Sequence, residues 1–203
     1  MRLSFIILFI SHTTILKGSV IVPLPKERIH TIDDIYALPE GTRAELIDGQ
    51  IYYMAPPSRI HQKIVSHLNK VMANYIDSNN GSCEVYPAPF AVFLNKDNTN
   101  YLEPDISIIC DHDKLTDKGC KGAPDWIIEI ISPGNPGRDY IDKLSLYNTA
   151  GVREYWIVNP INRTIFVYFL ETDNFNVTPY TFQDKIKVNI YNDLTINFTE
   201  LII

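Results

Sequence analysis

The chain has 203 residues, of which 45% are hydrophobic and 21% are charged. These proportions are those of an ordinary globular protein, and they exclude a disordered, collagen-like or coiled-coil chain. The 24 acidic residues outnumber the 18 basic ones, which gives a formal net charge of −6. Because a protein held on nucleic acid by its overall charge would be basic, any nucleic-acid role must rest on a local site.

The N-terminal end carries a short apolar run. Residues 3–10 read LSFIILFI and follow Arg2. The run is too short to span a bilayer, which needs about 20 apolar residues, so no membrane association is predicted. A charged start before a short apolar core also occurs in signal peptides. Since no clear cleavage site follows, a signal peptide, a translation start upstream of the biological one and a first strand all stay open. We treat residues 1–29 as an N-terminal extension and residues 30–203 as one domain.

The three cysteines, Cys83, Cys110 and Cys120, lie far apart in the sequence. Their number is odd and their spacing matches no metal-binding motif, so neither a disulfide framework nor a zinc site is predicted. Unpaired cysteines are typical of reducing compartments, which favours a cytoplasmic location. Export through the N-terminal apolar run is the alternative.

Helices are predicted from the spacing of apolar residues and from the residues that begin and end them. In chain order they cover residues 32–38, 59–77 and 138–150. Thr31 begins the first helix, and Ser58, after two prolines, supplies the N-cap of the second. Gly151 follows the third, where a glycine commonly ends a helix.

The predicted strands are short, and they cover residues 43–47, 50–54, 84–94, 105–110, 126–131, 154–158 and 164–170. Asp48-Gly49 between the first two favours a tight hairpin turn, because aspartate and glycine tolerate the positive φ angles that such a turn requires. Prolines interrupt the third, which favours a sheet edge or a bend. Residues 126–131 (WIIEII) are apolar on both faces apart from Glu129, as expected for a central strand covered on both sides.

The order of these elements indicates the fold class. Helix, hairpin, helix, three strands, helix and hairpin follow one another, and the tail, residues 171–203, is predicted to hold further short strands and no helix. This order favours one mixed β-sheet flanked by helices, an α/β or α+β fold.

Glu129 is out of place in an apolar strand. An ionised carboxylate there would be desolvated at a cost of several kcal/mol unless a cation offsets it. Asp105, directly after Pro104, begins another apolar strand. If the two strands are neighbours with aligned ends, the carboxylates converge and form a hard oxygen site suited to Mg²⁺ or Mn²⁺, which would keep water ligands and bind a substrate phosphate.

Lys143 lies just inside the next predicted helix. If that helix packs on the sheet, its ammonium group reaches the same pocket, where it could orient or help to deprotonate the attacking water, or neutralise phosphate charge. Taken singly, each residue has an ordinary structural explanation: Asp105 caps a turn, Glu129 pairs with an interior arginine, and Lys143 is solvated. Their order along the chain is what favours catalysis.

The segments around these residues resemble a known family. In chain order they are LPEG at 38–41, ELIDGQI at 45–51, His61-Gln62, Glu103-Pro104-Asp105, DWIIEIISP at 125–133, the helix from Arg138-Asp139 through Lys143 to Tyr147, and AGVREYW at 150–156. The series resembles the Uma-two family of restriction endonucleases, in the PD-(D/E)xK nuclease superfamily, over about residues 30–200. The resemblance implies a restriction-endonuclease-like core that hydrolyses phosphodiester bonds with a divalent metal.

The same resemblance implies roles for individual residues. Asp105 and Glu129 match the metal-binding acids of the family. The usual lysine position of the superfamily, two residues after the second acid, is Ile131 here, so the amine would come from the next helix as Lys143. Glu45 matches a further acidic position that would complete the metal shell or bind a second metal. As a strand residue beside the hairpin turn, it could equally face solvent.

Substrate contacts are less marked in the sequence. His61, near the start of the long helix, would face the pocket or else lie on the surface, and Arg138 lies near the predicted site. Further basic residues are Arg59, Lys63 and Lys70 on one helix face and Lys114, Lys118 and Lys121 in a loop. Each would neutralise a phosphate if correctly placed, although an ordinary solvated surface is the commoner explanation. No zinc finger, RNP motif or helix-turn-helix is found, so base-specific recognition is not predicted.

The leading hypothesis is a Mg²⁺- or Mn²⁺-dependent endonuclease that acts on DNA through Asp105, Glu129, Lys143 and Glu45. A homodimer would suit double-strand cutting by an enzyme with a single site. The alternative is a binding or scaffold protein that keeps the nuclease fold without turnover, which Ile131 and the acidic composition favour. An exported protein is a third hypothesis, motivated by the N-terminal apolar run.

Overall fold

The computed structural model describes residues 28–94, 98–133, 137–172 and 176–201. The N-terminal apolar run and nearly all of the predicted extension lie outside these residues. No helix within the described ranges is both long enough and apolar enough to cross a membrane.

Six strands of the described chain form the central sheet, in the order β11-β10-β9-β8-β5-β3. Their bounds are β3 Glu84–Pro87, β5 Ile106–Ile109, β8 Trp126–Ile130, β9 Glu154–Asn159, β10 Thr164–Phe169 and β11 Asn176–Thr181. β8 and β9 are parallel, whereas the other neighbouring pairs are antiparallel. The predicted mixed sheet is therefore confirmed, with the proline-interrupted strand β3 at one edge and β8 in the interior.

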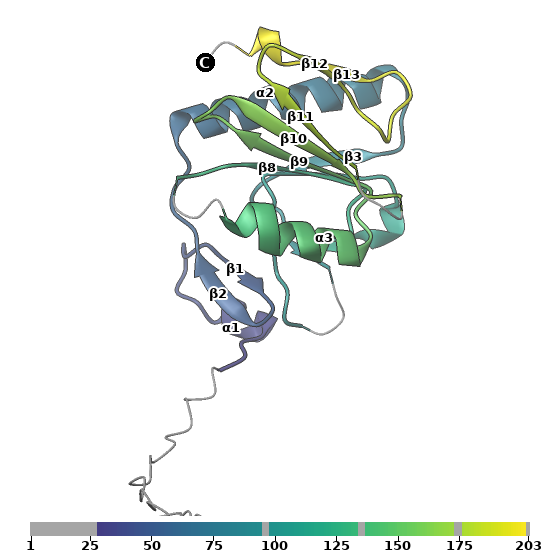
Figure 1. Cartoon of the computed structure of the whole chain (residues 1–203). Coiled ribbons are helices and arrows are strands. Elements are labelled where there is room, and N and C mark those ends of the chain that lie inside the picture. The colour runs from purple at the N-terminus through teal and green to yellow at the C-terminus, as the bar shows by residue number, and fades with distance from the viewer. Residues whose placement is uncertain (1–27, 95–97, 134–136, 173–175, 202–203) are drawn as a thin grey trace, which may run out of the picture.

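Helices cover both faces of this sheet (Figure 1). α2 (Arg59–Ser78) lies on one face, and α3 (Leu144–Ala150) lies on the other, in the connection between the parallel strands β8 and β9. Trp126 and Ile128 pack in the core on the α2 side, whereas Ile127 packs in the core on the α3 side. The strand β8 carries apolar side chains on both faces of the sheet because helices cover both faces.

Local sequence signals set most helix boundaries. α2 begins after Ser58, whose Oγ accepts the backbone N–H of His61 at 3.2 Å. α3 ends at Gly151, which has a φ of +93°. The helix predicted over residues 32–38 ends at Tyr36. The helix predicted over residues 138–150 begins with a π-helical turn, η2 (Arg138–Lys143), before α3 follows.

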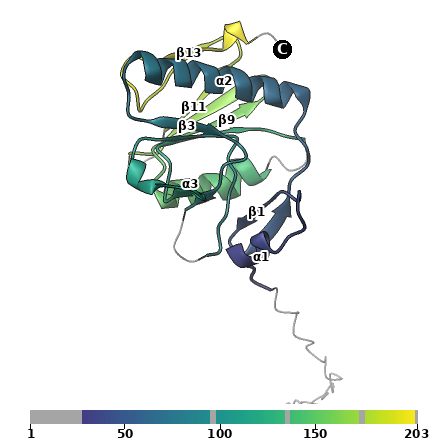
Figure 2. The same cartoon turned by 180° about the vertical axis from the view of Figure 1, so that it is seen from behind.

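A small N-terminal layer lies on the α3 side of the sheet (Figure 2). It consists of α1 (Ile32–Tyr36), β1 (Ala44–Ile47) and β2 (Gln50–Tyr53). The predicted tight turn is present, with φ angles of 47° at Asp48 and 78° at Gly49. Backbone hydrogen bonds between Leu46 and Tyr101 join this hairpin to the rest of the protein.

Several short elements complete the fold. The bounds are β4 Val92–Phe93, η1 His112–Lys114, β6 Leu115–Thr116, β7 Gly119–Lys121, β12 Lys185–Lys187, β13 Thr195–Asn197 and η3 Phe198–Glu200. β6 and β7 were not predicted. β7 pairs with both β4 and β6, and a Cβ on Gly119 in β7 would lie 2.2 Å from the carbonyl oxygen of Ala91. Only glycine therefore allows these chains to approach so closely.

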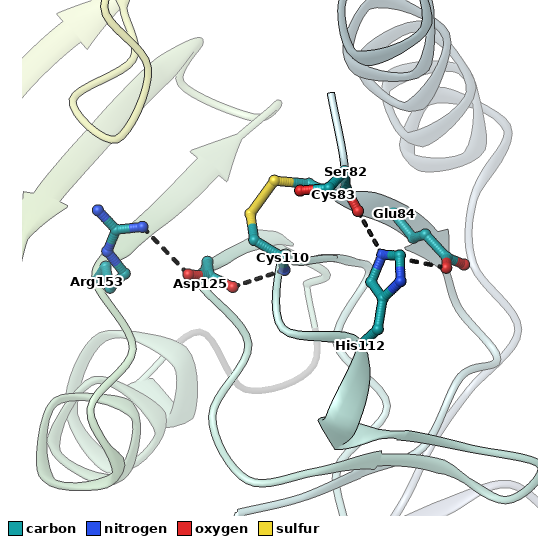
Figure 3. Close-up of a disulfide and its surroundings, with 7 residues drawn as sticks. All are labelled: Ser82, Cys83, Glu84, Cys110, His112, Asp125 and Arg153. Carbon is teal, nitrogen blue, oxygen red and sulfur yellow. Dashed lines mark hydrogen bonds and ion pairs between the residues drawn. A yellow bond between two sulfur atoms is a disulfide. The ribbon is translucent and has the colours of Figure 1, made fainter. Parts of the chain in front are cut away.

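A disulfide joins Cys83 to Cys110 (Figure 3). The prediction that no disulfide forms is therefore wrong, although Cys120 is free and buried. The antiparallel register of β3 and β5 pairs Glu84 with Ile109, so the two cysteines face each other one position further out, with their Cα atoms 3.8 Å apart. Their separation of 27 residues in the sequence hides this proximity.

Polar contacts surround the disulfide (Figure 3). Asp125 accepts the backbone N–H of Cys110 at 2.8 Å and pairs with Arg153 at 3.2 Å. On the other side, the His112 ring contacts the carbonyl oxygen of Ser82. The cross-link and its neighbours thus fasten the end of β5 that is remote from Asp105.

Candidate active site

A cavity of about 630 Å³ lies where β5 begins and β8 ends. Its walls include all six residues that the sequence analysis proposed for the site, namely Glu45, His61, Asp105, Glu129, Arg138 and Lys143. The fold brings these residues together from the hairpin, the sheet and both helical layers. Their catalytic and binding roles stay predictions.

Asp105 and Glu129 occupy facing positions on neighbouring strands. β5 and β8 are antiparallel with Ile106 opposite Ile128, so continuing this register by one residue sets Asp105 opposite Glu129. The two carboxylates accordingly line one cavity at one end of the sheet. The sequence predicted that these carboxylates would converge if the two strands were neighbours, and the two strands are neighbours.

Asp105 is held from two directions. Its Oδ2 accepts the backbone N–H of Ile130 at 2.7 Å and lies 3.0 Å from Nε2 of His61. His61 is buried in the first turn of α2, and its side chain points at the site rather than at solvent. The surface position that the sequence left open for His61 is therefore wrong.

Glu129 is buried, and a single oxygen takes two hydrogen bonds. Its Oε1 accepts from Nζ of Lys143 and from the hydroxyl of Tyr147, both at 2.9 Å. Burial raises the pKa of the Glu129 carboxyl well above its ordinary value; the Lys143 ammonium opposes this shift, and the neighbouring carboxylates add to it.

Lys143 is also buried and lies among three carboxylates. Its Nζ lies 2.9 Å from Oε2 of Glu45, 2.9 Å from Oε1 of Glu129 and 3.5 Å from Oδ1 of Asp139. Burial by itself would lower the pKa of Lys143, but these acids outweigh it and hold that pKa well above the ordinary value. The solvated position considered for Lys143 is therefore wrong, and the group is an ammonium at neutral pH.

Glu45 does not face solvent. It is only 3% exposed, and its Oε1 accepts the backbone N–H of Glu103 at 3.1 Å as well as a hydrogen bond from Lys143 at 3.0 Å. The alternative of a solvent-facing Glu45 is therefore wrong. The side chain joins the β1–β2 hairpin to the ammonium group of the site.

Arg138 lies at the rim of the cavity. Its guanidinium stacks over the Tyr52 ring at 3.9 Å from the ring centroid. Its Nε is buried and has no hydrogen-bond partner in the described part of the chain. The stacked, half-buried guanidinium leaves hydrogen-bond donors for an anion at the mouth of the cavity.

Two side chains in contact with the site were missed. Asp139 is four residues before Lys143, a spacing that brings side chains together on a helix. Burial raises the pKa of Asp139, although Lys143 opposes the shift. Tyr147 lies in the third predicted helix, and the sequence gives no signal that its hydroxyl reaches Glu129.

The donor set fits a hard divalent cation. Among the described residues, no three histidine, cysteine, aspartate or glutamate side chains are grouped so as to hold a metal ion between them. Mg²⁺ needs no such cage, since it is commonly held by one or two carboxylates together with water and substrate phosphate. Asp105 and Glu129 supply two carboxylates to one cavity and meet that requirement.

The fold and this cavity define the class of the molecule, a restriction-endonuclease-like fold with acids at the ends of adjacent strands. A crystal structure from Anabaena variabilis, described as a putative nuclease belonging to DUF820, is similar to it with a TM-score of 0.67 and 22% sequence identity. The match covers 84% of this chain and 96% of that chain. The two proteins therefore share a fold.

The chain belongs to the Uma2 family, described as "Putative restriction endonuclease", whose model matches residues 32–199. It is also 26% identical over 146 residues to an uncharacterised protein of Synechocystis sp., a match that covers 71% of this chain and 75% of that protein. The family resemblance inferred from the sequence is confirmed. The family supports nuclease activity, which is a hydrolase reaction.

Proposed function

We propose that the protein is an endonuclease that hydrolyses phosphodiester bonds of DNA with Mg²⁺ or Mn²⁺. The observation that carries the proposal is the meeting of Asp105, Glu129 and Lys143 in one cavity, in a chain of the Uma2 family. Asp105 and Glu129 would hold the cation. When bound, such a cation supplies positive charge to the phosphate and lowers the pKa of a coordinated water.

Lys143 enters this site as a cation. Without a bound divalent cation, the neighbouring acids hold its pKa well above the ordinary value, so the side chain is an ammonium near pH 7. Its hydrogen bonds to Glu45 and Glu129 fix both carboxylates. A phosphate entering the cavity would also meet its positive charge.

The cavity is acidic without a bound cation. Its lining contains the carboxylates of Glu45, Glu103, Asp105, Glu129 and Asp139 against the cationic side chains of Arg43, Arg138 and Lys143. A polyanion would be repelled from such a lining, so DNA must enter together with a neutralising dication. Arg138, at the rim, is the side chain that we assign to a phosphate.

The test is plasmid cleavage by the full chain with Mg²⁺ or Mn²⁺. We expect the wild type to convert supercoiled plasmid to nicked or linear forms, and Asp105→Asn and Glu129→Gln each to lose roughly a hundredfold or more in rate. The exposed Glu40→Gln is the matched control and should cleave as the wild type does. Equal activity in all preparations would reveal a contaminating nuclease and refute the assignment.

The rival function is a nuclease-fold protein that binds nucleic acid without turnover. One specific observation favours it: Ile131, at the usual lysine position, is apolar and buried. Against it stands Lys143, whose ammonium lies in the same cavity as the acids. Binding of a DNA duplex with Mn²⁺, without any cleavage of duplex, single strand or RNA, would establish the rival.

The assembly and the compartment belong to the same proposal. Residues 30–203 would act as one domain, and two copies would cut the two strands of a duplex. A cytoplasmic location was expected from unpaired cysteines, and the Cys83–Cys110 disulfide removes that argument. Fractionation of cells with an antibody to the chain, together with N-terminal sequencing, decides between cytoplasm and export.

A further inference from the structure

Each of the two facing acids has one oxygen that is bonded twice. Oδ2 of Asp105 takes the backbone N–H of Ile130 and the His61 ring, while Oε1 of Glu129 takes Lys143 and Tyr147. In the described part of the chain, no donor is placed on Oδ1 of Asp105 or on Oε2 of Glu129. In each carboxylate, one oxygen accepts two hydrogen bonds and the other, Oδ1 of Asp105 or Oε2 of Glu129, accepts none from the described residues.

The side-chain donors come from the two helical layers on opposite faces of the sheet. His61 belongs to the first turn of α2, fixed there by the Ser58 cap, and Tyr147 belongs to α3. Both side chains are buried, with exposed fractions of 6% for His61 and 0% for Tyr147. Neither donor can therefore swing away into solvent, and the orientation of each acid is set by packing.

The two ring nitrogens of His61 differ in their hydrogen bonding. A carboxylate oxygen only accepts, so the Nε2 atom that contacts Asp105 must carry a proton. Nδ1 on the same ring is buried and has no hydrogen-bond partner among the described residues. Within the described residues, the contact with Asp105 is therefore the side-chain hydrogen bond that fixes this ring.

We propose that His61 and Tyr147 are positioning residues for the cation-binding acids. His61 orients the Asp105 carboxylate so that its Oδ1 faces the cation. Tyr147 orients the Glu129 carboxylate so that its Oε2 faces the cation. The proposal rests on the proposed function and adds the residues that orient its metal ligands. Such outer partners typically change metal affinity by about 10- to 100-fold when they are removed.

The test is Mn²⁺ binding to the full chain, measured by calorimetry and by the Mn²⁺ paramagnetic resonance spectrum. His61→Gln keeps an amide N–H where Nε2 stands, whereas His61→Asn carries its amide at the Nδ1 position, one bond too short. We expect Asn to weaken Mn²⁺ binding by about 10- to 100-fold and Gln to restore it. Tyr147→Phe, which loses only the hydroxyl, should weaken binding by a similar factor.

The controls are a second histidine of α2 and a tyrosine away from the cavity, as His67→Asn and Tyr180→Phe. Both should bind Mn²⁺ as the wild type does, and circular dichroism without metal should show every variant folded. If His61→Asn and Tyr147→Phe bind Mn²⁺ as tightly as the wild type, the positioning roles are wrong while the nuclease proposal stands. Equal weakening by Gln and Asn also refutes the role of the His61 donor. A wild type that binds no Mn²⁺, even with a DNA duplex, refutes both proposals.

Discussion

Lys143 lies among a cluster of buried acids and opposes the rise in pKa that burial causes at Glu129 and Asp139. Its ammonium contacts Glu45, Glu129 and Asp139, which come from a hairpin, the central sheet and the π-helical turn. A buried carboxylate without a cation is costly, so each acid depends on this one side chain. Lys143 therefore joins three elements as well as serving the proposed reaction.

Replacing Lys143 with Met should reduce the free energy of unfolding by about 3–5 kcal/mol near pH 8, the usual cost of removing one partner from a buried ion pair. The loss should shrink as the pH falls toward about 5. In the variant the buried carboxyls have a higher pKa folded than unfolded, so the folded state binds more protons and gains stability on acidification.

Urea unfolding across this pH range measures the effect. The exposed Lys187→Met, which carries the same change in charge, is the control and should leave the free energy of unfolding nearly unchanged. A loss for Lys143→Met that is independent of pH would mean that the acids do not depend on the ammonium.

Glu154 is another buried acid, and the hydrogen-bond partners of its carboxylate are all neutral. It is 0% exposed, and its carboxylate accepts from Nε1 of Trp156 at 2.7 Å, from the backbone N–H of Ile190 at 3.0 Å, and from the backbone and side-chain N–H groups of Asn189 at 2.8 and 2.9 Å. It thereby fixes the C-terminal loop to β9.

Glu154→Ala should destabilise the protein by about 3 kcal/mol or more, because several buried donors lose their acceptor together. Thermal or urea unfolding measures the change, with the exposed Glu40→Ala as control. Since Glu154 does not line the cavity, Mn²⁺ binding by the folded variant should stay unchanged. A near-neutral Glu154→Ala would show that the loop does not need this carboxylate.

At the scale of elements, the features predicted well are those with local signals. The Asp48-Gly49 turn, the Ser58 cap and the Gly151 helix end each depend on a few adjacent residues, and all three are present. Features that depend on pairing were missed. The sequence gives no measure of the register that sets Cys83 beside Cys110, or of the packing that buries Glu45.

The candidate site was predicted in part for the same reason. A charge inside an apolar strand is visible in the sequence, which is why Glu129 was identified. Tyr147 and Asp139 could not be separated from ordinary helix residues, because their contacts with Glu129 and Lys143 exist only once the helix packs on the sheet. The π-helical turn that carries Asp139 also has no marked sequence signal.

The disulfide should contribute measurably to the stability of the edge between β3 and β5. Closing a loop of this length, 27 residues apart in the chain, is expected to stabilise the fold by about 3–4 kcal/mol through the entropy of the unfolded chain. Unfolding in denaturant with and without a reductant measures it. The Cys83→Ser/Cys110→Ser double variant should have the same free energy of unfolding as the reduced wild type, and a reductant should not change it. If the reductant lowers the free energy of unfolding of both proteins equally, the prediction is wrong.

At the scale of the whole molecule, the net charge of −6 and the acidic cavity predict that the proposed DNA binding depends on divalent cations. We expect a DNA duplex to be bound in Ca²⁺, used as a dication that seldom supports hydrolysis, and to be released in EDTA. The Asp105→Asn/Glu129→Gln double variant removes both proposed cation ligands and the repelling charge of Asp105, and it should bind equally well in both conditions. A mobility-shift titration at fixed ionic strength measures this, since salt alone weakens such complexes. Tight binding of the wild type in EDTA would contradict the prediction.

Cys83 and Cys110 form a disulfide and Cys120 is free. The number of free thiols in a preparation therefore shows whether the protein was made under oxidising or reducing conditions. Burial raises the pKa of the Cys120 thiol to about 11, so that group reacts slowly with thiol reagents in the folded protein. A thiol assay after denaturation should therefore find one thiol in an oxidised batch and three in a reduced batch. The choice of expression host decides which of the two a laboratory studies.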